Sequence, residues 1–534
     1  MIKTRFIIFG LILLVFITYF NSLNNVFLSD DLAEIVQNPN IGNLGHAIST
    51  HSFSFMRPVL YSLTYNIFGL NPVFFRLINI LFHIGSVLVI FAIFKYLKKT
   101  NLGILVASVF AVHPAIGEAV VWISGGMYPQ YTFFFLLSFY LYIRGKDEKK
   151  YYWPSVFTFL LSFYGHPQMP TPLFVMFPLW ELSFGNLKKN FIKTIPFFVI
   201  AVFYLFVSFG GLQERVSTLQ STHYQQLGKD NLLITLPISI SSYFELIFWP
   251  KTLTLYHSEL NFGHIEFIIR AALTVLFLAG ILVAFKKHKF IFFWSSLFLV
   301  ALAPTLTPFR LNWLVAERYL YLPILGIIAV TAFGFEKLVQ KIKLKWLFVV
   351  WVAVTIALMG RSINRNIDWK NEDNLWIATG KTSPSSPNTH NNLGDVYGRW
   401  GDKQRALQEF QKAIELKPNY GDAYHNLANT YRELGQIDKA LENYQNALKF
   451  NPNLWQSYQN IAAIYFEQKQ YGKAQENIQQ AIQINPKNIN LYINLGVVYL
   501  IMGEKEKAKE VFNLVLSADP QNQMARQGLI EANK

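Results

Sequence analysis

Long apolar stretches fill the chain up to Gly360 and restrict this part to a helical membrane fold. About 20 apolar residues are enough for a helix to cross a bilayer. We therefore predict that residues 1–360 form a polytopic helical domain with about eleven crossings, in an all-α protein. The stretches interpreted as spans are 5–21, 77–97, 102–121, 129–143, 152–165, 170–184, 191–209, 266–285, 290–306, 319–336 and 345–360.

The composition agrees with a membrane protein and argues against nucleic-acid binding. Only 15% of the 534 residues are charged and 52% are hydrophobic, whereas soluble domains carry about a quarter charged residues. The net charge is +15, but residues 361–534 hold 20 Lys/Arg against 18 Asp/Glu. The excess, 27 against 14, lies in residues 1–360. A basic excess in short loops between apolar spans is the positive-inside pattern of membrane proteins.

The basic loops predict the orientation in the cell (inner) membrane. They alternate with loops that hold few basic residues, so the N-terminus is expected in the cytoplasm. The loops expected outside are 22–76, 113–128, 164–170, 210–264 and 307–318, with 232–249 interpreted as interfacial or re-entrant. An odd number of crossings places everything after Gly360 outside. The basic clusters are Lys95/Lys98/Lys99, Arg144/Lys146/Lys149/Lys150, Lys188/Lys189/Lys193, Lys286/Lys287/Lys289 and Lys337/Lys341/Lys343/Lys345.

The C-terminal part has an internal repeat of 34 residues. Small residues in a fixed register allow two helices to cross closely, and a proline closes each unit. This pattern resembles the tetratricopeptide repeat. We predict a repeat domain over 386–534, with four repeats and a capping helix, after a linker over 361–385. The repeating positions are Gly394/Ala428/Ala462/Gly496, Tyr397/Tyr431/Tyr465/Tyr499, Ala406/Ala440/Ala474/Ala508 and Pro418/Pro452/Pro486/Pro520.

Carboxylates are scarce in the membrane part, so those predicted to lie outside are informative. Asp30 and Asp31 follow the first span, where two adjacent carboxylates repel each other unless a cation or a reacting proton is shared. In one interpretation, one carboxylate is a general base and the other binds a metal or orients the substrate. In the other interpretation, the pair caps and begins a helix over residues 32–36. Glu118 is interpreted as a ligand that holds a divalent cation (Mg²⁺ or Mn²⁺) together with Asp31, or as a group that orients a substrate hydroxyl.

Cations and histidines on the same side are the other candidates. Arg57 and Arg318 are suited to holding a lipid-linked phosphate bidentately. Alternatively, they anchor the protein at the membrane interface, and Arg318 is then neutralised by Glu317 and flanked by the tyrosines of its motif. His113 and His166, each followed by proline, either contact a phosphate or sugar hydroxyl or are satisfied within the fold.

Cofactor motifs give a further restriction. The sequence holds no cysteine, no phosphate loop, no dinucleotide fingerprint and no HExxH motif. Nucleotide sugars and ATP are cytoplasmic, so an enzyme acting outside needs a donor that arrives in the membrane. A lipid phosphate meets that requirement, and no nucleotide cofactor is expected.

Several stretches together resemble the GT-C type polytopic glycosyltransferases fused to tetratricopeptide repeats, such as the transmembrane O-mannosyltransferases with repeats. Where that family usually shows a Lys-Glu pair after the fifth span, this chain reads Tyr164-Gly165-His166-Pro167-Gln168. The matching stretches are Asp30-Asp31, Arg57-Pro58-Val59-Leu60, Asn79–His83, His113-Pro114 with Glu118, Ala316–Pro323 (AERYLYLP) and Arg365-Asn366 with Trp369.

The resemblance implies transfer of a mannose-like sugar, with inversion, from a polyprenyl-phosphate donor to a hydroxyl, expected to be Ser or Thr of a polypeptide. It implies that Asp30 or Asp31 is the acceptor-activating base, Glu118 its partner carboxylate and Arg318, with Arg57, the donor-phosphate ligand. His113, His166 and Tyr319 are further pocket candidates.

The repeat domain is expected to present the acceptor polypeptide on its concave face. Two alternatives remain open: an inactive membrane-anchored scaffold for an envelope complex, and an oligosaccharide ligase that uses a lipid-diphosphate donor.

Overall fold

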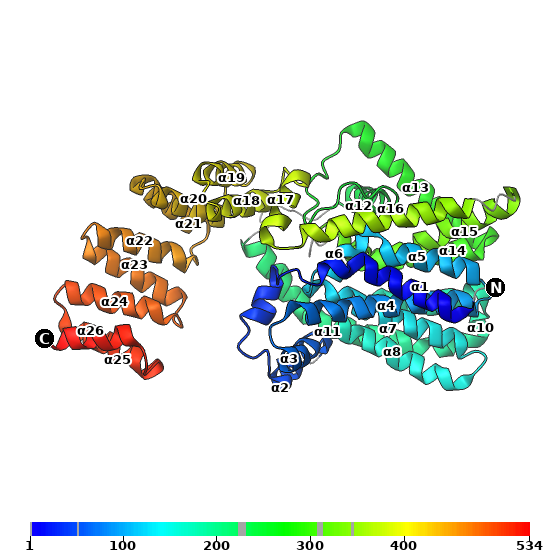
Figure 1. The fold of residues 1–534 in the computed structure, drawn as a ribbon, viewed down its shortest axis with the longest axis horizontal. Helices are drawn as coiled ribbons and strands as arrows, with labels where there is room; N and C mark the ends of the chain where they lie inside the picture. The colour runs from blue at the N-terminus through cyan, green and yellow to red at the C-terminus, as the bar shows by residue number, and fades with distance from the viewer. Residues whose placement is uncertain (1–2, 51–52, 223–230, 307–312, 343–346) are drawn as a thin grey trace. The chain divides into compact units, whose positions relative to one another are not determined.

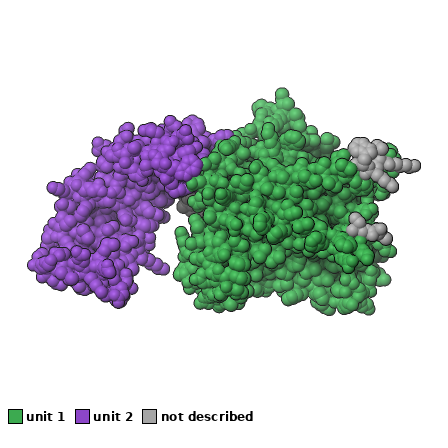
Figure 2. Space-filling view, viewed as in Figure 1, with its two compact units in different colours: residues 1–382 green, residues 383–534 purple. Residues whose placement is uncertain are grey.

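The computed structural model describes residues 3–50, 53–222, 231–306, 313–342 and 347–534, which form two compact units. The first unit runs over Met1–Thr382 and the second over Ser383–Lys534 (Figure 2). All regular elements in the described residues are helices, which confirms the all-α fold class. Residues 223–230 and 307–312, in loops expected outside, lie beyond the described residues.

The first unit is a bundle of apolar helices around one large hydrophobic core (Figure 1). Helices α4, α5, α7 and α8 pack pairwise, and α1 lies against α4 and α5. The helices are α1 (Thr4–Tyr19), α2 (Leu44–Thr50), α3 (Met56–Phe68), α4 (Pro72–Tyr96), α5 (Thr100–Val112), α6 (Gly117–Val121), α7 (Met127–Arg144), α8 (Tyr152–Gly165), α9 (Met176–Phe184), α10 (Leu187–Asn190), α11 (Ile195–Thr222), α12 (Leu232–Phe248), α13 (His264–Lys287), α14 (Lys289–Leu302), α15 (Ile324–Ile342), α16 (Leu347–Asp368) and α17 (Glu372–Thr382).

Membrane-crossing capacity is clear for part of this bundle. Five described helices are long and apolar enough to cross a membrane, or six if a pair bent by 59° counts as one span. That pair is Thr100–Val112 with Pro114–Val121, and the bend falls at His113-Pro114, where proline cannot donate the helical hydrogen bond. Shorter apolar helices such as α12 and α14 pack beside them, so about eleven crossings stays a prediction.

The stretch 361–385, predicted to be a linker, is mostly helical and packed, so this prediction was wrong. Helix α16 continues through Gly360 to Asp368, and α17 follows directly. Polar residues at the end of α16 have partners deep in the first unit: the Asn366 side-chain amide donates to the Thr18 carbonyl at 2.8 Å. These tertiary contacts allow a polar sequence to continue a membrane helix.

The second unit consists of four helix pairs and a last helix. Its helices are α18 (Pro387–Arg399), α19 (Lys403–Leu416), α20 (Gly421–Glu433), α21 (Ile437–Phe450), α22 (Trp455–Glu467), α23 (Tyr471–Ile484), α24 (Ile489–Ile501), α25 (Lys505–Ala518) and α26 (Gln523–Asn533). The small residues of the repeat lie where paired helices cross. A Cβ atom added to Gly496 of α24 would come within 2.6 Å of the Phe512 ring of α25.

Gly496→Val is therefore expected to destabilise the last repeat by about 1–3 kcal/mol, because the added atoms overlap the ring. Amide hydrogen exchange of α24 and α25 in the whole chain measures this directly. Gly472→Val is the control, because a Cβ atom at Gly472 meets nothing within 4 Å. Equal exchange in the two variants would contradict the close approach.

Candidate active site

The two adjacent aspartates after the first span have different surroundings. The Asp31 side chain is fully buried. Its Oδ1 accepts hydrogen bonds from the Ser124 backbone N–H at 2.8 Å and the Ser124 hydroxyl at 2.5 Å, and its Oδ2 accepts from the Leu28 N–H at 3.1 Å. Asp30 is exposed and has no hydrogen-bond or ion-pair partner among the described residues. Asp31 therefore holds the loop in place, whereas Asp30 remains accessible.

The local backbone explains this division. Ser29 has φ of +52°, a left-handed conformation that turns the chain just before the aspartates. A π-helix over Leu32–Val36 follows. Burial raises the pKa of Asp31, although the bonds from Ser124 and Leu28 and the charge of Arg76 oppose the rise. Asp30 is thus the member of the pair that is exposed, whereas the Asp31 carboxylate is occupied by hydrogen bonds inside the fold.

Arg57 lies on the Asp30 side of the site. Its Nη2 pairs with Glu34 at 2.7 Å, and its Nη1 donates to the Ser124 carbonyl at 3.2 Å. Burial raises the pKa of Glu34, while Arg57 lowers it. Arg57 and Glu34 also line a small cavity of about 100 Å³ together with His46 and Tyr61. The Arg57 guanidinium is therefore engaged with a carboxylate and a carbonyl in this structure.

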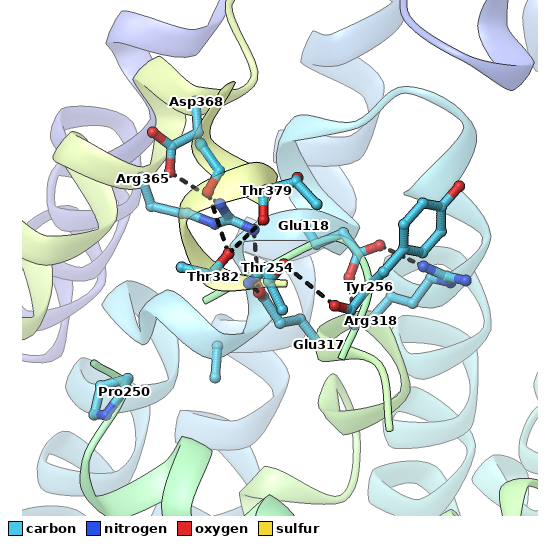
Figure 3. Close-up of polar contacts among 12 residues, drawn as sticks. Glu118, Pro250, Thr254, Tyr256, Glu317, Arg318, Arg365, Asp368, Thr379 and Thr382 are labelled. Carbon is cyan, nitrogen blue, oxygen red and sulfur yellow. Dashed lines mark hydrogen bonds and ion pairs between the residues drawn. The ribbon is translucent and has the colours of Figure 1, made fainter. Parts of the chain in front are cut away.

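Glu118 and Arg318 form a buried ion pair. Arg318 Nη1 lies 2.5 Å from Glu118 Oε1, and the Arg318 backbone N–H donates to Oε2 at 3.0 Å (Figure 3). The guanidinium carbon lies 5.7 Å from the Trp122 ring and 5.2 Å from the Tyr319 ring. Nε and Nη2 have no hydrogen-bond partner among the described residues. The partner of Arg318 is thus Glu118, and the interpretation that Glu317 neutralises Arg318 was wrong.

Glu317 instead pairs with Arg365, at 3.1 Å, and both side chains are buried (Figure 3). Arg365 also bonds Asp368 at 2.9 Å, and Glu317 Oε1 accepts from the Thr254 N–H at 2.5 Å. Burial raises the pKa of Glu317, and Arg365 opposes the rise. This network joins the end of α16 to the loop after α12 and to the residue next to Arg318.

The segment Glu118–Ser124 connects the two halves of the site, because it contacts both the Asp31 loop and Arg318. The Trp122 indole N–H donates to the Leu28 carbonyl at 3.4 Å. Ser124 binds Asp31, and Glu118 binds Arg318. The Asp31 carboxylate and the Arg318 guanidinium, from distant parts of the chain, are therefore both bonded to one stretch of seven consecutive residues.

Two side chains of α4 fix this segment. The buried Arg76 guanidinium donates to the Val121 carbonyl at 2.7 Å and to the Asn25 carbonyl at 2.7 Å. The Asn79 amide donates to the Trp122 and Ile123 carbonyls, each at 3.1 Å. Sequence reasoning missed the role of Arg76, although a charged residue at the start of an apolar helix is a signal that could have revealed it.

The two histidine candidates are engaged inside the fold. His113 Nδ1 accepts from the Ala115 N–H at 3.2 Å, and Nε2 lies 2.9 Å from the Ile247 carbonyl, which it can bond only as a donor. Both ring nitrogens are therefore used, in agreement with the interpretation of a satisfied histidine. His166 Nδ1 faces the Gln168 N–H at 3.3 Å. Its ring lies 5.5 Å from that of Tyr128, which in turn lies 6.2 Å from the Tyr319 ring.

The tentative metal ligands Asp31 and Glu118 do not form a ligand set here. The oxygens of Asp31 accept from Ser124 and Leu28, and those of Glu118 face Arg318. No group of three or more His, Cys, Asp or Glu side chains suited to a metal occurs among the described residues. The residues present do not fit the metal site that was predicted, and a metal requirement stays a prediction.

Tetratricopeptide repeat models match residues 387–420, 421–454, 443–476 and 465–530. The chain is therefore an all-helical protein that joins an apolar helical unit to tetratricopeptide repeats. Among solved structures, MamA shares 22% identity over 30% of this chain and 85% of its own, with a TM-score of 0.26. YrrB, a TPR protein with an unusual peptide-binding site, shares 18% over 36% of this chain and 96% of its own, with a TM-score of 0.26.

About three quarters of the chain is similar to protein O-mannosyl-transferases, which confirms the resemblance drawn from its motifs. It is 25% identical over 77% of its length to the protein O-mannosyl-transferase F38B6.6 of Caenorhabditis elegans and covers 62% of that protein. It is 24% identical over 75% of its length to the protein O-mannosyl-transferase TMTC3 of Homo sapiens and covers 50% of it. The chain thus spans half to three-fifths of these relatives.

Proposed function

We propose that this chain is a membrane glycosyltransferase that transfers a mannose-like sugar from a polyprenyl phosphate to a Ser or Thr hydroxyl of a polypeptide. The observation that carries the proposal is that the Glu118–Ser124 segment contacts Asp31, the neighbour of the exposed carboxylate Asp30, at one end and the Arg318 guanidinium at the other. The similarity to protein O-mannosyl-transferases supports the same reaction.

In the proposed reaction the acceptor oxygen attacks the anomeric carbon while the bond from that carbon to the phosphate oxygen breaks. The hydroxyl proton passes to Asp30, and polyprenyl phosphate leaves with the bonding electrons. Attack from the face opposite the phosphate inverts the anomeric centre. Arg318 stabilises the charge that develops on the phosphate, through Nε and Nη2, while Nη1 stays on Glu118.

The proposed acceptor is a polypeptide bound by the repeats. An asparagine recurs every 34 residues on the first helix of each repeat, at Asn392, Asn426, Asn460 and Asn494. Two of them, Asn460 and Asn494, line a cavity of about 300 Å³ with Phe466 and Val497. Amide groups beside apolar side chains are suited to binding an extended backbone and its side chains.

The proposed location is the cell (inner) membrane, with the N-terminus in the cytoplasm and the repeats outside. The basic loop at Lys286-Lys287 ends α13 and supports this orientation, because such clusters stay on the cytoplasmic side. The loop that follows α12, like the Asp30 loop, then faces outward. A donor carried in the membrane reaches this side without a nucleotide.

Arg318→Lys tests the assignment of the donor-phosphate ligand. Lysine keeps the charge beside Glu118 but loses the planar fork, so kcat/KM for the lipid donor is expected to fall about 10²-fold. Transfer from labelled polyprenyl-phosphate mannose to a Ser/Thr peptide, by protein in lipid nanodiscs, measures the change.

Arg144→Lys is the matched control, because Arg144 also pairs with one glutamate, Glu148 at 2.5 Å, but far from the proposed site. Equal transfer by Arg318→Lys and wild type would remove Arg318 from the mechanism. Wild-type transfer from a lipid-diphosphate donor alone would favour a ligase. Absence of transfer with any donor would favour the scaffold alternative.

A further inference from the structure

A second cavity lies between helices α12 and α13 and the loop that joins them, and its lining residue Thr254 bonds Glu317, the neighbour of Arg318. Its volume is about 420 Å³, within the range of about 300–1,000 Å³ typical of small-molecule sites. Its lining includes Trp249, Thr252, His257, Phe262, Glu266 and Arg270. The proposed transfer reaction makes no use of these residues.

One residue of the lining, His257, has a polar atom without a hydrogen-bond partner among the described residues. His257 Nε2 is buried and makes no hydrogen bond with any described residue. Burial, followed by the charges of Arg365 and Arg318, lowers the pKa of His257 to about 3. The imidazole is therefore neutral at physiological pH and presents one donor and one acceptor nitrogen. A buried nitrogen without a partner costs stability, which a hydrogen-bonding ligand in the cavity would recover.

The charges around the cavity are largely balanced. Arg270 bonds Glu266 at 2.9 Å, Glu245 at 3.2 Å and the Ser241 hydroxyl at 3.1 Å, and its guanidinium carbon lies 3.8 Å from the Phe262 ring centre. The lining carries two cations, Lys251 and Arg270, against three carboxylates, Glu245, Glu259 and Glu266. The lining itself carries no excess of positive charge that would select a phosphate, so it favours a neutral ligand.

Aromatic side chains complete the lining. Trp249 is 71% exposed, and the Phe262 ring is stacked on Arg270. A pyranose ring presents apolar C–H groups on its faces and hydroxyls around its edge. Aromatic rings can pack against the faces of the sugar ring. The hydroxyls can form hydrogen bonds with carboxylates, with a fixed guanidinium and with a neutral imidazole. Trp249 alone would be explained as an interfacial anchor, but that explanation does not account for the unpartnered nitrogen of His257.

We propose that the cavity between α12 and α13 binds a carbohydrate, with its hydroxyls bonded to His257 and Glu266 and a ring face against Trp249. This is a binding site and not a second transfer centre. The proposal does not depend on the transfer reaction, because sugar binding can be measured in protein that transfers nothing.

The test uses the whole chain in lipid nanodiscs and methyl α-D-mannopyranoside as the probe, followed by saturation-transfer NMR. Transfer of saturation to the sugar ring protons is expected for the wild type. Binding is expected to weaken about tenfold in His257→Ala and in Trp249→Ala, because each removes one main contact. His257→Gln, which retains a donor, is expected to bind between these limits.

His288→Ala is the matched control, because this exposed histidine follows α13 at its other end and should leave binding unchanged. Asp30→Asn should also bind the sugar normally, which separates this site from the proposed transfer centre. Absence of saturation transfer in the folded wild type would overturn the proposal. So would equal binding by wild type, His257→Ala and Trp249→Ala, or competition of the sugar by inorganic phosphate.

Discussion

Asp30→Asn is expected to reduce transfer from the polyprenyl-phosphate donor about 10²–10⁴-fold while the protein stays folded, because the amide cannot accept the acceptor proton. Asp30 is exposed and makes no hydrogen bond with the described residues, so its replacement removes no structural contact. Initial rates of peptide glycosylation at saturating donor, together with the thermal unfolding midpoint of the same sample, measure the two effects separately.

Asp31→Asn is the matched control for this experiment. An asparagine at this position would turn an N–H donor toward the Leu28 N–H or toward Ser124, where Asp31 now accepts three hydrogen bonds. We expect a stability loss of about 1–3 kcal/mol and a lower unfolding temperature, with the remaining folded protein active. If Asp30→Asn transferred at the wild-type rate and Asp31→Asn did not, Asp31 would become the base and Asp30 would lose that role.

Arg365→Met is expected to give the largest loss of stability. In this variant the buried Glu317 carboxylate loses its ion pair with Arg365. Among the described residues it then keeps one hydrogen bond, from the Thr254 N–H at 2.5 Å. Removing one member of a buried pair costs about 3–5 kcal/mol, since the other charge stays buried without compensation. Thermal unfolding in nanodiscs, followed by tryptophan fluorescence, measures the change.

The double variant Arg365→Met/Glu317→Gln is expected to recover part of that loss, because the uncompensated charge is gone. Arg144→Met removes a solvent-exposed pair and is expected to leave the unfolding temperature unchanged. An unchanged unfolding temperature for Arg365→Met would show that this ion pair contributes nothing to the first unit.

The fold class and the repeats were predictable because their signals are local. Apolar stretches of about 20 residues and a 34-residue period can be read directly along the chain, so tertiary contacts were not needed to find them. The end of α16 was not predictable in this way. Its polar residues Arg365 and Asn366 are tolerated in a continuous helix only because Glu317 and Thr18, far away in sequence, receive their hydrogen bonds.

The sequence singled out Asp30, Asp31, Glu118 and Arg318 as candidates, but it could not predict which groups they bond. Asp30 and Asp31 are equivalent in sequence, and the difference between them comes from Ser124, which lies 93 residues from Asp31 and binds one carboxylate but not the other. In the same way, Glu317 is adjacent to Arg318, yet the bend at His113-Pro114 brings Glu118 to that guanidinium. Charge adjacency along a chain does not identify ion pairs when the backbone between helices turns sharply.

The way the Glu118–Ser124 segment is held affects which changes in loop length the protein can tolerate. Because Arg76 and Asn79 hold this short stretch, the positions of the proposed proton acceptor and of the proposed phosphate ligand depend on few residues. If the proposed transfer takes place here, the surrounding loops could differ in length and admit other acceptors while this stretch keeps the reacting groups in place. Acceptor choice and reaction geometry would then depend on different stretches of one polypeptide.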